Sequence, residues 1–328
     1  MSWSKGVIGE VRMKIDQAQR ILTLSHLRPD GDAVGSLIGF GLAMRSLGKQ
    51  VEMVLSDGAP QIYKFLSGHD QIRAKADGSF DFIVVLDCSD RKRAGPALNA
   101  YPKPDLNIDH HQTNENFARY NLVNVEAVAT AEIVTDLLEV WDIPMDQAIA
   151  NALLTGIVTD TLGFRTSNVT PQTLRRAADL MAAGGELTDL YYRTLTQNSL
   201  SGARFWGIGL TKLQCDQGII WTSLSQEDRR LVNYPGRDDA DLINILSTIE
   251  GVEIAVIFLE QSGGRVKISW RLCGRAESDL DVSQAALLFG GGGHKAAAGA
   301  EVQGTLSDIQ AIVLDATRAL INGRENRN

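Results

Sequence analysis

Acidic and histidine side chains gather at four points of this sequence. The first point runs from His26 through Asp30 to Asp32, the second is Asp87, the third is Asp109-His110-His111 and the fourth is Asp160. Carboxylates together with imidazoles suit Mn²⁺ and similar divalent cations. The three cysteines, in contrast, show none of the paired spacing of a structural zinc site. These residue types therefore predict a centre for divalent cations.

Two cations held in such a centre can hydrolyse a phosphate ester. At a separation of roughly 3.5–4 Å they lower the pKa of a bridging water, clamp the phosphoryl oxygens and stabilise both the attacking and the leaving oxygen. Hydrolysis of a phosphate ester is therefore one chemistry that a centre of this kind could perform.

The elements that must position these residues alternate between strands and helices in the first half of the chain. Apolar runs predict strands at 21–25, 51–55, 82–86 and 106–108. Helical patterns cover 33–47, 130–140, 146–159 and 171–183. This alternation predicts a parallel sheet with helices on both faces. Three of the four points directly follow predicted strands, and ligands of open parallel sheets bind beyond the carboxyl ends of the strands.

The second half predicts a smaller α/β domain of different pattern. Helices are expected at 201–213, 240–249, 282–288 and 306–321. Strands are expected at 219–223, 252–259 and 265–271, the last two joined by a hairpin turn at 262–264. We expect a first domain over 1–188, a helical linker over 189–214 and a second domain over 215–328, with the active site in the cleft between the domains.

A second candidate site lies in the glycine-rich stretch that runs from Phe289 to Gly299. Its glycines would let backbone N–H groups approach an anion without obstruction by side chains, which would make the stretch a phosphate cradle. A glycine run by itself is equally typical of a flexible turn.

The four points and the glycine-rich stretch together resemble the DHH phosphoesterase superfamily. HLRPDGDAVGS, Asp87, Asp109-His110-His111 and Asp160 are similar to its four signatures, in family order. FGGGGHKAAAG is similar to the GGGHxxAAG signature of the DHH-associated C-terminal domain. The compact form with both domains resembles the group of nanoRNases and pAp phosphatases.

The resemblance implies two divalent cations, Mn²⁺ or alternatively Mg²⁺ or Co²⁺, and a role for each residue. One cation would be held by His26, Asp30 and Asp87, and the other by Asp32, Asp87, His110 and Asp160, so that Asp87 bridges both. His111 would face the substrate phosphate, and Asp109 would act behind it.

The same resemblance implies the residues that bind substrate. His294 and the glycines Gly291, Gly292 and Gly293 would hold a phosphate and the nucleotide. Arg271, at the end of a predicted strand, is the preferred phosphate contact because its planar fork of donors suits phosphate. Arg165 would reach the scissile region, although a structural role for it is equally open.

The implied substrates are oligoribonucleotides a few residues long, linear dinucleotides such as pApA, and the 3′-phosphate of pAp. A cyclic dinucleotide as main substrate and a nucleotide-binding regulator without catalysis remain alternatives. A pyrophosphatase is disfavoured by the C-terminal signature. The resemblance also allows a homodimer.

Charge and hydropathy set outer limits on the partners. The net charge of −8 disfavours a protein that holds long nucleic acid by its backbone. No stretch approaches the roughly 18 apolar residues of a membrane span. Glu10 and Asp16 lie where a signal peptide would be apolar. We therefore expect a cytoplasmic protein with neither a membrane nor a long duplex as partner.

Overall fold

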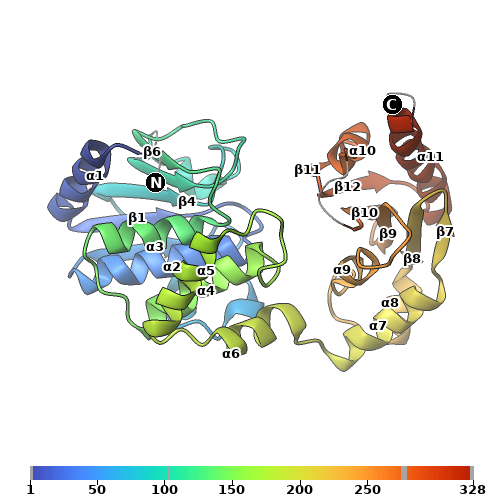
Figure 1. Ribbon diagram of the computed structural model, residues 1–328, viewed down its shortest axis with the longest axis horizontal. Helices are drawn as coiled ribbons and strands as arrows, with labels where there is room; N and C mark the ends of the chain where they lie inside the picture. The colour runs from blue at the N-terminus through green and yellow to red at the C-terminus, as the bar shows by residue number, and fades with distance from the viewer. Residues whose placement is uncertain (1–2, 102, 275–278, 326–328) are drawn as a thin grey trace. The chain divides into compact units, whose positions relative to one another are not determined.

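The chain divides at Gln197 into two units, Met1–Gln197 and Asn198–Asn328 (Figure 1). The computed structural model describes residues 3–101, 103–274 and 279–325. The division falls within the segment predicted as a linker. Leu187 and Leu195, before the division, pack on the core of the first unit, whereas Phe205 is buried in a core of the second.

Six parallel strands form the sheet of the first unit, in the order β3-β2-β1-β4-β5-β6. Their bounds are β1 Arg20–Leu24, β2 Gln50–Val54, β3 Ile72–Arg73, β4 Phe82–Leu86, β5 Leu106–Asp109 and β6 Tyr120–Val123. Every residue of β4 is buried, as its continuous β-branched and aromatic run predicts. The strand order reverses between β1 and β4, and such a switch point is where ligands of open α/β sheets bind.

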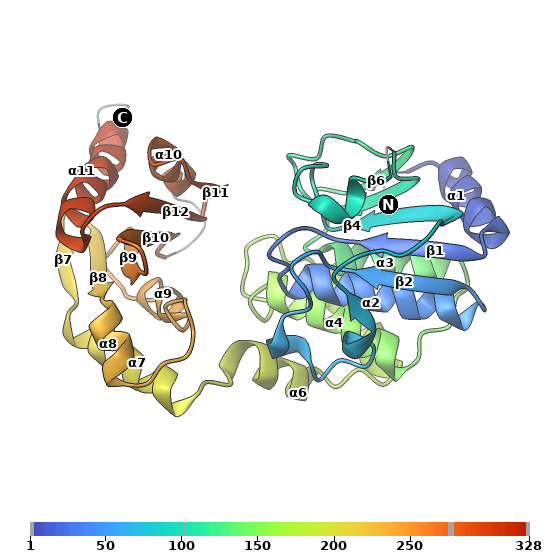
Figure 2. The ribbon, with the colours of Figure 1, turned by 180° about the vertical axis from the view of Figure 1, so that it is seen from behind.

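The helices of the first unit cover one face of this sheet. They are α1 Lys5–Gln17, α2 Gly31–Ser46, α3 Thr130–Val140, α4 Gln147–Asp160, α5 Pro171–Ala182 and α6 Leu187–Tyr191, followed by a π-helical turn, Tyr192–Thr196. In the two opposite views of Figures 1 and 2, α2 and α4 lie below β1 and β4. Side chains of β1 and β4 alternate between the core under these helices and a second core on the other face.

The prediction of helices on both faces was wrong. The second core is covered by segments that follow β3, β4 and β5, in which the described helix is the short 3₁₀ turn Pro96–Leu98. Two other 3₁₀ turns, Gln61–Tyr63 and His69–Gln71, follow β2, and Tyr63 packs in the core under the helices. The segments that cover the second core contain Gly78, Gly95 and Pro96, and both glycines have positive φ. Such residues break a helix after a few positions, so the connections cover the sheet as loops.

Glycines allow α2 and α4 to pack backbone against backbone. A Cβ atom on Gly35 would lie 2.4 Å from the carbonyl oxygen of Ala152. A Cβ atom on Gly156 of α4 would lie 2.7 Å from Oδ1 of Asp32. The start of α2, with two predicted cation ligands, therefore lies beside the end of α4, where Asp160 is the last residue.

The second unit is built on a mixed sheet in the order β11-β12-β10-β9-β8-β7, in which only β8 and β9 pair in parallel among the described strands. The strands are β7 Gln214–Asp216, β8 Ile219–Leu224, β9 Ile254–Gln261, β10 Arg265–Leu272, β11 Gly292–His294 and β12 Ala297–Gln303. The helices are α7 Leu200–Thr211, α8 Gln226–Leu231, α9 Leu242–Leu246, α10 Val282–Leu288 and α11 Leu306–Glu325. One core contains Trp270 and side chains of α10 and α11, and another contains Phe205 and side chains of α9.

Several predicted bounds were confirmed and others were wrong. The predicted elements at 82–86, 130–140 and 282–288 coincide with β4, α3 and α10. The helix expected over 240–249 is shorter in the structure, where α9 covers Leu242–Leu246. The strands β6 and β12 were not predicted. Cys88 and Cys273 are buried as expected for small apolar residues, but Cys215 is exposed. Within the described residues, no helix combines the length and apolar character needed to cross a membrane.

The close packing of α2 on α4 predicts that Gly35→Ala destabilises the first unit. The added methyl group must push the helices apart, and such overpacking costs about 1–3 kcal/mol. Gly9→Ala is the matched control, because a Cβ atom at Gly9 in α1 meets nothing within 4 Å. Alanine in a helix is more stable than glycine by roughly 0.5–1 kcal/mol. Urea unfolding of both variants checks the difference, and equal free energies of unfolding would contradict the packing argument.

Candidate metal centre

Local structure explains why the predicted ligands of the first point converge. His26 follows β1, and Asp30 is the N-cap of α2, where its Oδ1 accepts a hydrogen bond from the N–H of Ala33 at 3.1 Å. Asp32 lies in the first turn of the same helix, where a carboxylate is favoured by the helix dipole. The turn from β1 into α2 thus presents one imidazole and two carboxylates at the carboxyl edge of the sheet.

A first group of ligand atoms forms around His26. Its Nε2 lies 3.4 Å from Oδ2 of Asp87 and 3.8 Å from Oδ1 of Asp30. Ligand atoms of these three residues all lie within 4.8 Å of one another, as the coordination of one ion requires.

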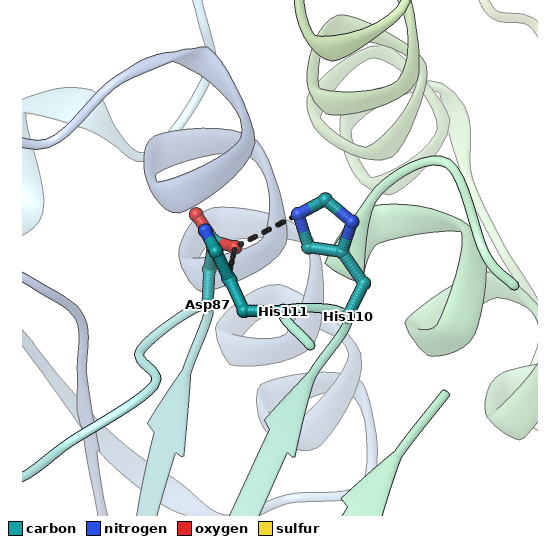
Figure 3. Close-up of side chains that lie close together, drawn as sticks. All are labelled: Asp87, His110 and His111. Atoms are coloured by element: carbon teal, nitrogen blue, oxygen red, sulfur yellow. Dashed lines mark ion pairs between the residues drawn. The ribbon is translucent and has the colours of Figure 1, made fainter. Parts of the chain in front are cut away.

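A second group forms around His110, which follows β5. Its Nε2 lies 3.5 Å from Oδ2 of Asp160, 3.7 Å from Oδ1 of Asp87 and 4.0 Å from Oδ2 of Asp32. Asp87 therefore faces both groups, with Oδ2 toward His26 and Oδ1 toward His110. Figure 3 shows Asp87 at the end of β4 with His110 and His111 paired to it.

The tautomers of His26 and His110 suit cation binding. Nδ1 of His26 lies 2.8 Å from the carbonyl oxygen of Leu27, and Nδ1 of His110 lies 3.3 Å from that of Ala127. A carbonyl oxygen can only accept, so Nδ1 of each ring carries the proton. In the neutral ring Nε2 then keeps the lone pair that a cation needs, which is the arrangement of histidines that bind metals.

The charges of the cluster also fit divalent cations. Nε2 of His26 is buried and, among the residues that the structure describes, has no partner at hydrogen-bond geometry. Burial and the neighbouring carboxylates of Asp87 and Asp160 raise the pKa of Asp32 well above its usual value. Burial raises the pKa of Asp160 to about 7, although His110 opposes the shift. Buried carboxylates that repel one another and a buried imidazole nitrogen without a partner are both satisfied by bound cations.

Three hydrogen bonds of this site were not predicted from the sequence. Oδ2 of Asp32 accepts from the N–H of Thr130 at 2.6 Å, and Oδ1 accepts from the N–H of Ala131 at 2.9 Å. The hydroxyl of Thr130 donates to Oδ1 of Asp87 at 3.0 Å. The first turn of α3 thus orients two carboxylates. The start of α3 was predicted at Thr130, but the sequence did not show which ligands it would face.

Asp87 has a backbone conformation that L-residues rarely adopt. Its φ is +52°, and its N–H donates to the carbonyl oxygen of Ile108 at 2.9 Å. Such a conformation costs on the order of 1–3 kcal/mol and persists at functional sites where the surrounding structure holds it. Here it lets one carboxylate face both ligand groups.

Asp109 and His111 lie beside the ligand groups. Asp109 is completely buried, and its Oδ1 lies 2.7 Å from Nδ1 of His111. Oδ2 of Asp109 accepts a hydrogen bond from the side chain of Asn114, which in turn contacts Asn107. The two asparagines were not identified from the sequence.

The second unit contains a cavity of about 460 Å³ that is lined by several of the predicted substrate residues. Lys267, Ser269 and Arg271 contribute from one face of β10, and Gly292 and Gly293 contribute from β11. Nε of Arg271 is buried and has no hydrogen-bond partner among the described residues. Such a guanidinium suits an anionic ligand. Three carboxylates, Asp238, Asp239 and Asp241, line the same cavity and offset part of its positive charge.

The glycine-rich stretch is a β-hairpin rather than a loop. β11 pairs with β12, and a Cβ atom on Gly291 would lie 2.2 Å from the carbonyl oxygen of Gly299. Glycine is therefore required at 291 by the close approach of two backbone segments. His294 is exposed at the end of β11 and does not line the cavity, so the cavity and the expected histidine contact are separate features of this hairpin.

Arg165 is not brought into the cluster by any ion pair within the described part of the chain. Its side chain is exposed, and its backbone N–H donates to the carbonyl oxygen of Thr161 at 2.8 Å. The segment that precedes it has positive φ at Leu162, Gly163 and Phe164. The structural alternative for Arg165 therefore stays open.

Comparison with known proteins gives matches to two domain families. The DHH family, N-terminal domain, matches residues 20–157, which include all predicted cation ligands except Asp160. The DHHA1 domain matches residues 233–322, which include Arg271 and the glycine hairpin.

Relatives match across almost the whole chain. The "Bifunctional oligoribonuclease and PAP phosphatase NrnA" of Thermus thermophilus is 31% identical, over 96% of this chain and 94% of the relative. The "Cyclic-di-AMP phosphodiesterase GdpP" of Geobacillus thermodenitrificans is 27% identical, over 91% of this chain but 46% of the relative. The solved structure of an exopolyphosphatase-related protein from Bacteroides fragilis has a TM-score of 0.87 and 25% identity, over 97% of this chain and 98% of that one.

The hydrogen bond from Thr130 to Asp87 predicts that Thr130→Val weakens cation binding by about 10–100-fold, the usual effect of losing a partner of a metal ligand. The backbone N–H groups that hold Asp32 are kept in this variant. Thr135→Val is the matched control, because this buried hydroxyl of the same helix donates only to the carbonyl oxygen of Ala131. Calorimetric titration with Mn²⁺ measures both, and an unchanged affinity in Thr130→Val would contradict the assigned role.

Proposed function

Because the chain belongs to the DHH family of metal-dependent phosphoesterases, we propose that it hydrolyses short oligoribonucleotides, linear dinucleotides such as pApA, and the 3′-phosphate of pAp. The name of the Thermus thermophilus relative, an oligoribonuclease and PAP phosphatase, supports oligoribonucleotides and pAp as substrates. The single observation in the structure that carries the proposal is the position of Asp87, whose two oxygens face two groups of ligand atoms.

We assign the residues of the first group, His26, Asp30 and Asp87, to one cation. The second cation is assigned to Asp32, Asp87, His110 and Asp160, with Asp87 shared. Mn²⁺ is our first choice, and Mg²⁺ or Co²⁺ are also compatible, because carboxylates and imidazoles accept several divalent ions. When bound, two such cations supply Lewis-acid stabilisation of the phosphoryl oxygens and a lower pKa for bound water.

The remaining residues orient the substrate and stabilise developing charge. We assign His111 to the phosphate that reacts, with Asp109 holding its ring through Nδ1. A positioned imidazole of this kind stabilises charge that develops on oxygen or assists the leaving oxygen. Asp32 is almost completely buried beside the first turn of α3, so water is excluded from its carboxylate. Electrostatic interactions of this carboxylate are therefore stronger than they would be in water.

Phosphate binding by the second unit is assigned to the cavity on β10. Arg271 is the main contact. It is supported by its buried Nε atom, which has no hydrogen-bond partner in the described part of the chain, and by its place in the same cavity lining as Gly292 and Gly293. His294 and Gly291 belong to the same hairpin and are assigned to the nucleotide. Arg165 is proposed as a contact to the scissile region, with a structural role as its alternative.

A cyclic dinucleotide is the second candidate substrate. It is favoured by the Geobacillus thermodenitrificans relative, which is named a cyclic-di-AMP phosphodiesterase and is matched over 91% of this chain. A nucleotide-binding regulator without catalysis is disfavoured, because all six predicted cation ligands occur together in the two groups.

The proposal predicts Mn²⁺-dependent formation of AMP from pApA or pAp, and its loss in Asp87→Ala. Because Asp87 faces both ligand groups, this variant should lose more activity than Asp30→Ala or Asp160→Ala. The loss should also exceed the roughly 10–100-fold that is typical for a partner of a metal ligand. Chromatography of products from pApA, pAp and cyclic di-AMP, with Mn²⁺ and with EDTA, measures this. Turnover by Asp87→Ala equal to that of the unsubstituted protein in saturating Mn²⁺ would refute the assignment.

Arg271→Ala is expected to raise KM for pApA by about 10-fold or more, because a hydrogen bond to a charged group contributes roughly 1.5–3 kcal/mol. Arg265→Ala is the matched control on the same strand, since Arg265 is exposed and paired with Glu301 at 2.6 Å. Steady-state kinetics of both variants give the comparison. Equal KM values for the two variants would remove Arg271 from the phosphate site.

A further inference from the structure

We propose that Asn107 and Asn114 are positioning residues that hold Asp109 as a fixed acceptor and thereby keep the proton of His111 on Nδ1. The proposal deepens the assigned function, since it rests on His111 serving the substrate rather than a cation. The hydrogen bonds run from Asn107 through Asn114 and Asp109 to His111. The donor and the acceptor of each bond can be assigned by starting from the backbone groups that bind Asn107.

The geometry around Asp87 explains why the position of the ring proton of His111 must be fixed. Ligand atoms of Asp87, His110 and His111 lie within 4.8 Å of one another, so position alone would admit His111 as a cation ligand. Nδ1 of His111 lies 3.7 Å from Oδ1 of Asp87 and 2.7 Å from Oδ1 of Asp109. A nitrogen ligates a cation only through a lone pair. The location of the ring proton therefore decides the role of His111.

The chain of hydrogen bonds begins at two backbone carbonyl groups. The side-chain nitrogen of Asn107 lies 3.1 Å from the carbonyl oxygen of Val85 and 3.2 Å from that of Cys88. Since these oxygens can only accept, the amide nitrogen of Asn107 must face them. Its Oδ1 then accepts from the side-chain nitrogen of Asn114 at 2.8 Å.

A second backbone group fixes the orientation of Asn114 independently. The N–H of Asn116 donates to Oδ1 of Asn114 at 2.7 Å. The amide nitrogen of Asn114 is therefore on the other side, where it also donates to Oδ2 of Asp109 at 2.5 Å. Neither asparagine can turn over without losing bonds to backbone groups of fixed polarity.

Asp109, held by Asn114, acts as the acceptor in the hydrogen bond with His111. The carboxylate is completely buried, and its Oδ2 is engaged as an acceptor. An imidazole nitrogen is more basic than a carboxylate oxygen, so the proton between Asp109 and His111 lies on Nδ1. Nδ1 then has no lone pair for a cation, and the contact with substrate that we assign to His111 would be made through Nε2.

Two variants at Asn114 test the chain. Asn114→Asp keeps the shape and the acceptor for Asn116 but places a carboxylate oxygen against Asp109, so Asp109 must turn away or become a weaker, protonated acceptor. Asn114→Leu removes the donors altogether. The matched control is Asn121→Leu, because Asn121 is the register partner of Asn107 on β6 and its side chain bonds to the backbone of Ala118.

The readout is ¹⁵N and ¹H NMR of the Mg²⁺-loaded full chain with labelled histidine, which contains five histidine rings. His111→Gln assigns the signal. We expect Nδ1 of His111 to be protonated, with a downfield N–H proton that moves upfield in both Asn114 variants and is unchanged in Asn121→Leu. With pApA, both Asn114 variants should lower kcat by about 10–100-fold at nearly constant KM.

An unprotonated Nδ1 of His111 in the unsubstituted protein would overturn the proposal, as would an unaltered N–H signal and kcat in both Asn114 variants. The NMR result does not depend on turnover. If the unsubstituted protein hydrolysed none of the substrates, the proposed function would fail while the direction of the chain could still be decided.

Discussion

Mutual repulsion among carboxylates at one edge of the first sheet is the constraint on which the rest of this unit depends. Asp32, Asp87 and Asp109 are all almost completely buried there, and Asp30 and Asp160 lie beside them. Isolated buried carboxylates are costly, so each must be matched by a donor, an imidazole or a cation. The surrounding elements supply the donors and the imidazoles, and the geometry of the ligand groups suits cations.

Each neighbouring element stabilises some of these buried carboxylates. The first turn of α3 donates two N–H groups to Asp32 and a hydroxyl to Asp87. The glycines of α2 and α4 leave room for Asp32 beside the helix that ends with Asp160. Asn114, itself bonded to Asn107, donates a hydrogen bond to the buried carboxylate of Asp109, which is not among the candidate cation ligands. The two units thus contribute different chemistry, since the second unit offers a cavity lined by an arginine, a lysine, three aspartates and glycines.

Much of the first unit and its centre could be predicted from the sequence. β4 is a continuous buried run and α3 has apolar residues at helical spacing, so both were recognised with their bounds. The ligands other than Asp160 follow strands, and their roles were implied by the resemblance to the DHH family. The partners of these ligands could not be found in this way, because Thr130, Asn107 and Asn114 carry no periodic signal and matter only through contacts distant in sequence. β12 was missed because Ala-Ala-Gly-Ala has low strand propensity and is held by pairing with β10.

The central claim is that the cluster around Asp87 holds two cations that share this carboxylate. Anomalous diffraction at the manganese edge, from crystals of the full chain grown with Mn²⁺, tests it most directly. We expect two peaks roughly 3.5–4 Å apart, as in two-metal sites, one beside His26 and the other beside His110, with Asp87 in contact with both. A single peak, or two peaks of which only one contacts Asp87, would contradict the claim.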